Sequence, residues 1–339
     1  MTQEGRYLID KLIPQRDLIV AWGTPKSGKT FWALDIAFHI AMGKPYRGKK
    51  VVQGPVLYCA FEGQHGLRDR VTAYHMHHKG SDEAPLWLML NRMTFTRPTN
   101  TSLRKHREVI ELCLAEGVKP VLVILDTLNR SLDGSESSDE DMTFYTKAAE
   151  EICDAFNCAT LIVHHCGVNQ ERPRGHTSLT GTCSCQIAIR RETVLGEEDR
   201  VMSAQVEYIK DGPEGPKQFS YLRPIQIGSD EDGNIISSCV IEAAPDDVVA
   251  TGQKAGGGFL SSQAVKALAI LQPMSQRADD GWVRLADWRE ACMRSNISAS
   301  KNVESKRKAF LRALDQLNEN NKIVIKGEMV KSLTQGVTK

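Results

Sequence analysis

The chain has 339 residues, of which 41% are hydrophobic and 25% charged, as in globular proteins with a sizeable core and about two domains. It contains no run of 18 uncharged apolar residues and no signal-peptide pattern at its start, so we expect no membrane span and no membrane partner. An odd number of scattered cysteines, nine in all, favours free thiols and a cytoplasmic location.

The net charge of +1 is unevenly distributed along the chain. Residues 259–339 carry 14 Lys and Arg against 8 Asp and Glu, a net +6, whereas the remaining residues are net −5. A basic segment favours an acidic partner such as nucleic acid, although a solvated helical surface explains the same charge.

The first 245 residues alternate between predicted strands and helices. Apolar runs predict strands over Asp17–Trp22, Pro55–Phe61, Trp87–Leu90, Pro120–Leu125 and Ala159–Val163. Helical spacing predicts helices over Phe31–Met42, Leu67–Lys79, Ser102–Glu116 and Met142–Phe156. Four more short runs, joined by polar turns, predict an antiparallel extension: Gln186–Glu192, Val201–Ile209, Phe219–Pro224 and Ile235–Glu242. The expected fold class is α/β, with a mainly parallel sheet between helices.

A Gly-rich stretch over residues 246–258 predicts a linker between a domain at 1–245 and a smaller domain at 259–339. The smaller domain has three predicted helices followed by a hairpin: Ser261–Leu271, Leu285–Arg294, Ser305–Asn318 and Lys322–Val330. This order is typical of a winged helix, which fits the binding of DNA or of protein.

The stretch between the first predicted strand and the first predicted helix reads G-x-x-x-x-G-K-[ST], the phosphate-binding loop of P-loop NTPases. A strand, a glycine loop and a helix direct backbone N–H groups and a helix N-terminus at one anion. We expect Lys29 to reach the β- and γ-phosphates of ATP and Thr30 to ligate Mg²⁺. The predicted nucleotide-binding residues are Gly23, Thr24, Pro25, Lys26, Ser27, Gly28, Lys29, Thr30 and Phe31.

Polar side chains follow three other predicted strands. Asp126 occupies the Walker B position, where a carboxylate holds Mg²⁺. Glu62 closes a strand that we expect beside the P-loop strand, and a carboxylate there can orient the attacking water. His164 and His165 end the strand after that of Asp126. Because adjacent strand residues face opposite sides, at most one of the two histidines reaches the nucleotide.

Three cations are candidates for action on the nucleotide of a neighbouring subunit. Arg190 and Arg191 lie on the strand that follows the predicted loop Gly167–Gly181, and Lys210 precedes a polar turn. A cation in trans stabilises transition-state charge as an arginine finger does. For each of them, a solvated surface cation is an equally good interpretation.

Several segments together resemble the RecA-fold ATPases of the RepA type, the hexameric replicative helicases of small plasmids, with relatives in phages and genomic islands. The segments are Gly23–Thr30, Tyr58–Gly63, Leu125–Leu132, Glu140–Met142, Val163–His165 and Arg174–Ser178. The resemblance implies that Lys29, Glu62 and Asp126 are catalytic. It further implies that His165 senses the γ-phosphate and that Arg190 is the trans-acting finger.

The resemblance implies a hydrolase with ATP and Mg²⁺: a RecA-like helicase, hexameric as a homo-oligomer, that acts on single-stranded DNA in replication of a mobile element. Cys166–Val168 and Gly181–Ser184 depart from the family pattern, since they lack a Lys and an acidic residue respectively. The alternative is an ATP-gated DNA-binding replication initiator or regulator without helicase activity. A metabolic P-loop kinase is a third class, for which the sequence shows no phosphoacceptor pocket.

Overall fold

The structure is a computed structural model that describes residues 6–91, 93–95, 105–166, 173, 178–194, 197–210, 212–244, 262–295, 297, 302–319 and 322–333. The chain divides into two compact units, residues 1–191 with 202–243 and residues 192–201 with 244–339. The predicted linker, 246–258, lies outside the described residues. None of the described helices is long and apolar enough to cross a membrane.

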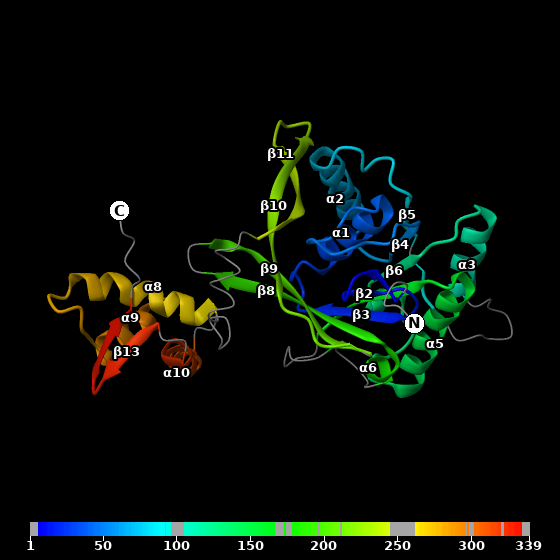
Figure 1. The fold of residues 1–339 in the computed structure, drawn as a ribbon. Helices are drawn as coiled ribbons and strands as arrows, with labels where there is room; N and C mark the ends of the chain where they lie inside the picture. The colour runs from blue at the N-terminus through cyan, green and yellow to red at the C-terminus, as the bar shows by residue number, and fades with distance from the viewer. Residues whose placement is uncertain are drawn as a thin grey trace. The chain divides into compact units, whose positions relative to one another are not determined.

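The first unit is built on a nine-stranded sheet with the strand order β11-β10-β9-β8-β3-β7-β6-β4-β5 (Figure 1). The strands are β3 (Leu18–Gly23), β4 (Val56–Ala60), β5 (Leu86–Met89), β6 (Leu122–Asp126), β7 (Ala159–His165), β8 (Cys185–Val194), β9 (Glu197–Ile209), β10 (Gln218–Ser229) and β11 (Ile235–Ala243). All neighbours from β5 to β8 pair in parallel, whereas β10 and β11 are antiparallel. The predicted fold class, a mainly parallel α/β sheet with an antiparallel extension, is confirmed.

Helices cover both faces of this sheet. One face carries α1 (Lys29–Met42) and α2 (Gln64–His77), and the other carries α3 (Lys105–Ala115), α4 (Leu128–Ser131), α5 (Asp139–Phe156) and α6 (Ser178–Thr182). Successive residues of a strand point to opposite faces, so in β3 Ile19 and Ala21 pack towards α1 while Val20 and Trp22 pack towards α5. Burial on both faces explains why the central strands are continuous apolar runs.

The strand order corrects one sequence expectation. The strand that precedes Glu62, β4, does not lie beside the P-loop strand β3, because β7 and β6 lie between them. Instead β4 pairs with β6 over its whole length, and Ala60 is in register with Asp126. The carboxyl ends of β4 and β6 therefore meet, which places the residues after both strands side by side.

Two short elements complete the first unit. A hairpin of β1 (Tyr7–Ile9) and β2 (Ile13–Pro14) precedes β3, and its apolar side chains join the core under α1. Most of the predicted loop Gly167–Gly181 lies outside the described residues, but its end forms the start of α6 rather than loop.

The second unit follows the order α8 (Ser262–Arg277), β12 (Val283–Arg284), α9 (Leu285–Arg294), α10 (Val303–Glu319), β13 (Ile323–Lys326) and β14 (Met329–Ser332). The strands form a small sheet of order β12-β14-β13. The core contains Trp288 and Phe310, whose rings meet edge to face with centroids 5.0 Å apart. The first helix continues past its predicted end at Leu271, through Pro273, because Leu271 and Met274 both pack into this core.

Candidate active site

The phosphate-binding loop joins a fully buried strand, β3, to helix α1. Gly28 precedes α1 with φ 96°, in the left-handed region that favours glycine. A Cβ atom there would lie 2.9 Å from the Met202 sulfur of β9. Gly23 has a different constraint, because a Cβ atom on it would collide with the carbonyl oxygen of Ile189 in the neighbouring strand β8. Both glycines are therefore required by the packing of the loop.

Lys29 folds back over its own loop. Its Nζ atom donates hydrogen bonds to the carbonyl oxygens of Gly23, at 3.1 Å, and Thr24, at 2.8 Å. Burial lowers the pKa of Lys29, while the nearby carboxylates of Asp126 and Glu62 favour its charged form. The ammonium group is thus held at the mouth of the loop, in electrostatic contact with both predicted catalytic carboxylates.

Asp126 ends β6 and is buried. Its Oδ2 atom accepts a 2.7 Å hydrogen bond from the hydroxyl of Tyr58 on β4. Burial raises the pKa of Asp126, and the hydroxyls of Tyr58 and Thr30 together with the charge of Arg70 oppose that shift. No described residue meets hydrogen-bond geometry at the buried Oδ1 atom. A buried carboxylate oxygen without a donor, close to the Thr30 hydroxyl, fits a hard cation such as Mg²⁺.

Glu62 lies beside the segment that follows Asp126. Its Oε2 atom accepts a 2.8 Å hydrogen bond from Nε of Arg130, and its Oε1 atom accepts a 3.4 Å bond from the Thr127 hydroxyl. The peptide bond between Asp126 and Thr127 is cis. These contacts fix the direction of the Glu62 carboxylate, which remains partly exposed and open to a water molecule.

The two histidines at the end of β7 occupy different environments. His165 is in register with Gly23 and His164 with Trp22 of β3. His164 is fully buried, whereas His165 is partly exposed. In β7, Val163 belongs to the cluster under α1, so strand alternation places His165 on the α1 face and His164 on the α5 face.

Arg190 contacts the P-loop strand of its own chain. Its guanidinium forms an ion pair with Glu207 of β9 and lies 5.4 Å from the ring centroid of Trp22, the residue before Gly23. Its side chain is 33% exposed, so the ion pair does not remove it from solvent. Arg191, the next residue, is exposed.

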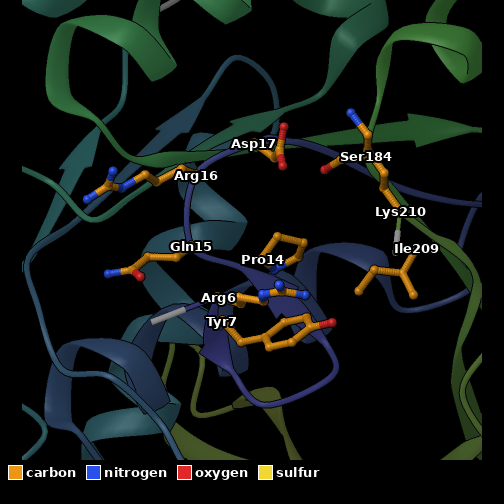
Figure 2. Close-up of a pocket in the computed structure, with 9 residues that line it drawn as sticks. All are labelled: Arg6, Tyr7, Pro14, Gln15, Arg16, Asp17, Ser184, Ile209 and Lys210. Atoms are coloured by element: carbon orange, nitrogen blue, oxygen red, sulfur yellow. The ribbon is translucent and has the colours of Figure 1, made fainter. Parts of the chain in front are cut away.

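Lys210 belongs to the opposite edge of the sheet. It lines a cavity of about 250 Å³ together with Asp17, which precedes β3, and with Ser184, Arg6 and Tyr7 (Figure 2). Burial raises the pKa of Asp17, which the hydroxyl of Ser184 and the charge of Lys210 oppose. The six residues of β3 separate this cavity from the P-loop by roughly 20 Å.

Sequence reasoning did not identify Tyr58, Arg70 and Arg130 as members of the site. Arg70 of α2 lies over the ring of Phe31, 4.7 Å from its centroid, and its charge favours the ionised form of Asp126. Tyr58 and Arg130 reach the two carboxylates across the β4–β6 pair. Knowledge that β4 pairs with β6 would have been needed to find them. Cys183 and Cys185 are free thiols, as the scattered cysteines of the sequence led us to expect.

The chain is similar to one family model and to several solved structures. No curated protein matches the chain. The RadB recombinase structure has 16% identity and a TM-score of 0.43, over 68% of this chain and 91% of that one. A KaiC-like protein from the archaeon Pyrococcus horikoshii OT3 has 12% identity and a TM-score of 0.46, over 71% and 96%. The family model AAA_25, described as an AAA domain, matches residues 2–171. Because this match spans half of the chain, the chain belongs to the AAA_25 family, which supports a P-loop ATPase.

Proposed function

We propose that the chain is the ATP-hydrolysing motor of a RepA-type replicative helicase, a hexameric homo-oligomer that acts on single-stranded DNA of a mobile element. One observation carries the proposal. Lys29, Asp126 and Glu62 come from three separate segments and meet at the carboxyl ends of the parallel strands. There the two carboxylates favour the charged form of Lys29. This combination of a phosphate-binding Lys and two carboxylates suits water attack on a γ-phosphate.

The roles follow from the geometry. The backbone N–H groups at the start of α1 and Lys29 bind the β- and γ-phosphates, with Lys29 exchanging its loop carbonyl partners for phosphate oxygens. Glu62, fixed by Arg130, orients the attacking water. Thr30 and Asp126 would hold Mg²⁺, and the metal would supply neutralisation of charge on the phosphate oxygens.

Two further residues are assigned to the nucleotide. His165 lies next to Gly23 on the α1 face, and there it senses whether the γ-phosphate is present. Arg190 completes the site of a neighbouring subunit as the arginine finger, with its partly exposed guanidinium held by Glu207 until the neighbour is engaged. Positioned cations of this kind act through electrostatic stabilisation of the transition state.

One observation favours the second candidate, an ATP-gated DNA-binding initiator or regulator. Residues 259–339 are net +6, whereas the segment from Ser131 to Asp141 in the first unit is acidic and poorly suited to hold DNA phosphates. In that case ATP sets the assembly state, the second unit binds DNA, and single strands leave the ATPase rate unchanged.

The first experiment measures the steady-state ATPase rate against protein concentration, with and without poly-dT, with Lys29→Ala as the blank. A rate per subunit that rises with concentration and increases with poly-dT supports a ring motor on single strands. A rate indifferent to both overturns the helicase proposal and favours the DNA-binding switch.

A mixing experiment tests the trans role of Arg190. Lys29→Ala removes the phosphate contact and Arg190→Ala the finger, so each variant alone is inactive. In a 1:1 mixture, about a quarter of the subunit interfaces pair an intact Lys29 with a neighbour's intact Arg190 and regain activity. A mixture as inactive as its components shows that Arg190 acts only within its own chain.

A further inference from the structure

Helix α10 of the second unit carries three exposed cations that form no ion pair among the described residues, although the exposed Glu304 and Asp315 lie within one turn of them. Arg307, Lys308 and Arg312 are all exposed along its first three turns. Within the part of the chain that the structure describes, none of the three takes part in an ion pair, whereas the arginines at the two ends of α9 are each paired with a nearby acid. The positive charge of α10 is therefore available to a partner.

The helix that carries these cations is firmly held. Phe310 packs against Trp288, whose indole N–H donates a 2.8 Å hydrogen bond to the Ala267 carbonyl of α8. The neighbouring Lys306 is used differently, since its Nζ atom donates to the carbonyl oxygens of Met293 and Ser295 at 3.1 and 3.2 Å. Lys306 thus joins α10 to the end of α9, while the three exposed cations have no such structural contact among the described residues.

The shape and chemistry of this part of α10 suit a duplex better than a single strand. Lys308 and Arg312 are four residues apart and share one side of the helix, with Leu311, 46% exposed, beside them. An α-helix about 10–12 Å wide fits the major groove of B-DNA. The large exposed hydrophobic side chains among the unit's described residues are Val303, Leu311 and Leu333, none of them aromatic. Single-strand binding relies on aromatic platforms for base stacking.

We propose that the second unit binds double-stranded DNA through α10, with Arg307, Lys308 and Arg312 contacting backbone phosphates. Helix α9 precedes α10 as the first helix of a helix-turn-helix pair precedes its recognition helix. This binding is separate from ATP hydrolysis, because every residue that carries it belongs to the second unit.

The rival partner is a protein. A groove of about 260 Å³ runs between α9 and α10, lined by Ala286, Arg289, Phe310, Leu311 and Leu314 among others. An apolar helix of another protein would enter this groove, whereas DNA phosphates would lie against the cations. Ala286 is exposed in the groove, so Ala286→Gln obstructs it without a change of charge.

The test measures the binding of a fluorescent 20-base-pair duplex to the full-length protein by anisotropy, between 50 and 200 mM KCl. The logarithm of the affinity falls with the logarithm of the salt concentration, and each phosphate contact adds about 0.9 to the steepness of that fall. The double variant Lys308→Gln/Arg312→Gln should therefore give a slope that is less steep by about 2. Over that fourfold range of salt, the double variant should lose about tenfold less affinity than the wild type. The matched control is Arg277→Gln, which removes an exposed cation at the end of α8 and should leave the slope unchanged.

Three results overturn the proposal: a slope unchanged in the double variant, an equal change in Arg277→Gln, or tighter binding of a single strand than of the duplex. Duplex affinity that falls in Ala286→Gln but not in the double variant also overturns it, because the DNA then contacts the groove and not the cations. A full-length protein that does not bind the duplex at all leaves the groove, and with it a protein partner, as the favoured interpretation. The ATPase response to poly-dT, measured on the same variants, shows separately whether the motor proposal holds. Gln retains helix propensity, so the double variant is expected to fold, and its circular dichroism confirms this before binding is compared.

Discussion

The hydrogen bond from Tyr58 to Asp126 provides a sharp test of the site, because it can be deleted by the removal of one buried oxygen atom. Tyr58→Phe deletes the hydroxyl that donates to Oδ2 of Asp126 at 2.7 Å. The chain also offers a matched control. Tyr145, buried as deeply, shares a 2.8 Å hydrogen bond with the hydroxyl of Ser131, a neutral partner, so Tyr145→Phe removes the same atom without a carboxylate.

The expected magnitude depends on the charge of the partner. A hydrogen bond to a charged group contributes about 1.5–3 kcal/mol, and a neutral one about 0.5–1.5 kcal/mol. Burial raises the pKa of Asp126, so the native carboxyl is protonated at low pH and its ionisation destabilises the fold as pH rises. Tyr58→Phe raises that pKa further. The free energy of unfolding should therefore fall by about 1 kcal/mol at low pH and by about 2–3 kcal/mol at pH 8.

The assay is urea unfolding of the first unit in metal-free buffer between pH 5 and pH 8. Tyr145→Phe should lower the free energy of unfolding by about 1 kcal/mol at every pH, because its partner does not titrate. An equal loss in the free energy of unfolding for Tyr58→Phe and Tyr145→Phe at every pH would contradict this prediction. That result would mean that Asp126 stays protonated throughout, or that water replaces the Tyr58 hydroxyl without loss.

Three further predictions concern stability and binding. Burial raises the pKa of Asp35 to about 7, so wild-type stability should fall by up to about 4 kcal/mol between pH 4 and pH 7, and Asp35→Asn should flatten this pH dependence in urea titrations. Gly28→Ala should abolish ATP binding in calorimetry and lower the free energy of unfolding by about 1–2 kcal/mol, since a left-handed residue gains a Cβ atom against Met202. Trp288→Ala should lower the free energy of unfolding of the second unit by about 3–5 kcal/mol and unfold that unit, while the first unit continues to hydrolyse ATP. A loss of ATPase activity in this variant would contradict the prediction.

Local patterns in the sequence were sufficient to predict the elements that carry the site. The P-loop was predicted because its glycines, Lys29 and Thr30 are adjacent in the chain. Asp126 was predicted because β6 is buried on both faces and therefore reads as an apolar run with an abrupt polar end. Asp126 and Lys29 do meet in the structure, as the motif implied.

The order of the strands could not be predicted in the same way. Pairing between β4 and β6 joins segments more than sixty residues apart, and nothing in either segment distinguishes β6 from β3 as the neighbour. With β4 assigned beside β3, the contact of Tyr58 with Asp126 was hidden. The bond between Arg130 and Glu62 was hidden for the same reason, although both residues lie in segments of the recognised motifs. Partners across strands depend on tertiary pairing, which local periodicity does not encode.

The close approach of Gly23 to β8 affects how substitutions in this loop are interpreted. The first glycine of a phosphate-binding loop is usually assigned to the ligand, yet here its missing side chain makes room for the Ile189 carbonyl of a neighbouring strand. A Gly23→Ala protein would have to separate β8 from β3 before any phosphate contact is altered. Loss of nucleotide binding in such a variant would thus report damage to the pairing of β3 with β8, where the antiparallel extension joins the parallel sheet, and not a lost phosphate contact.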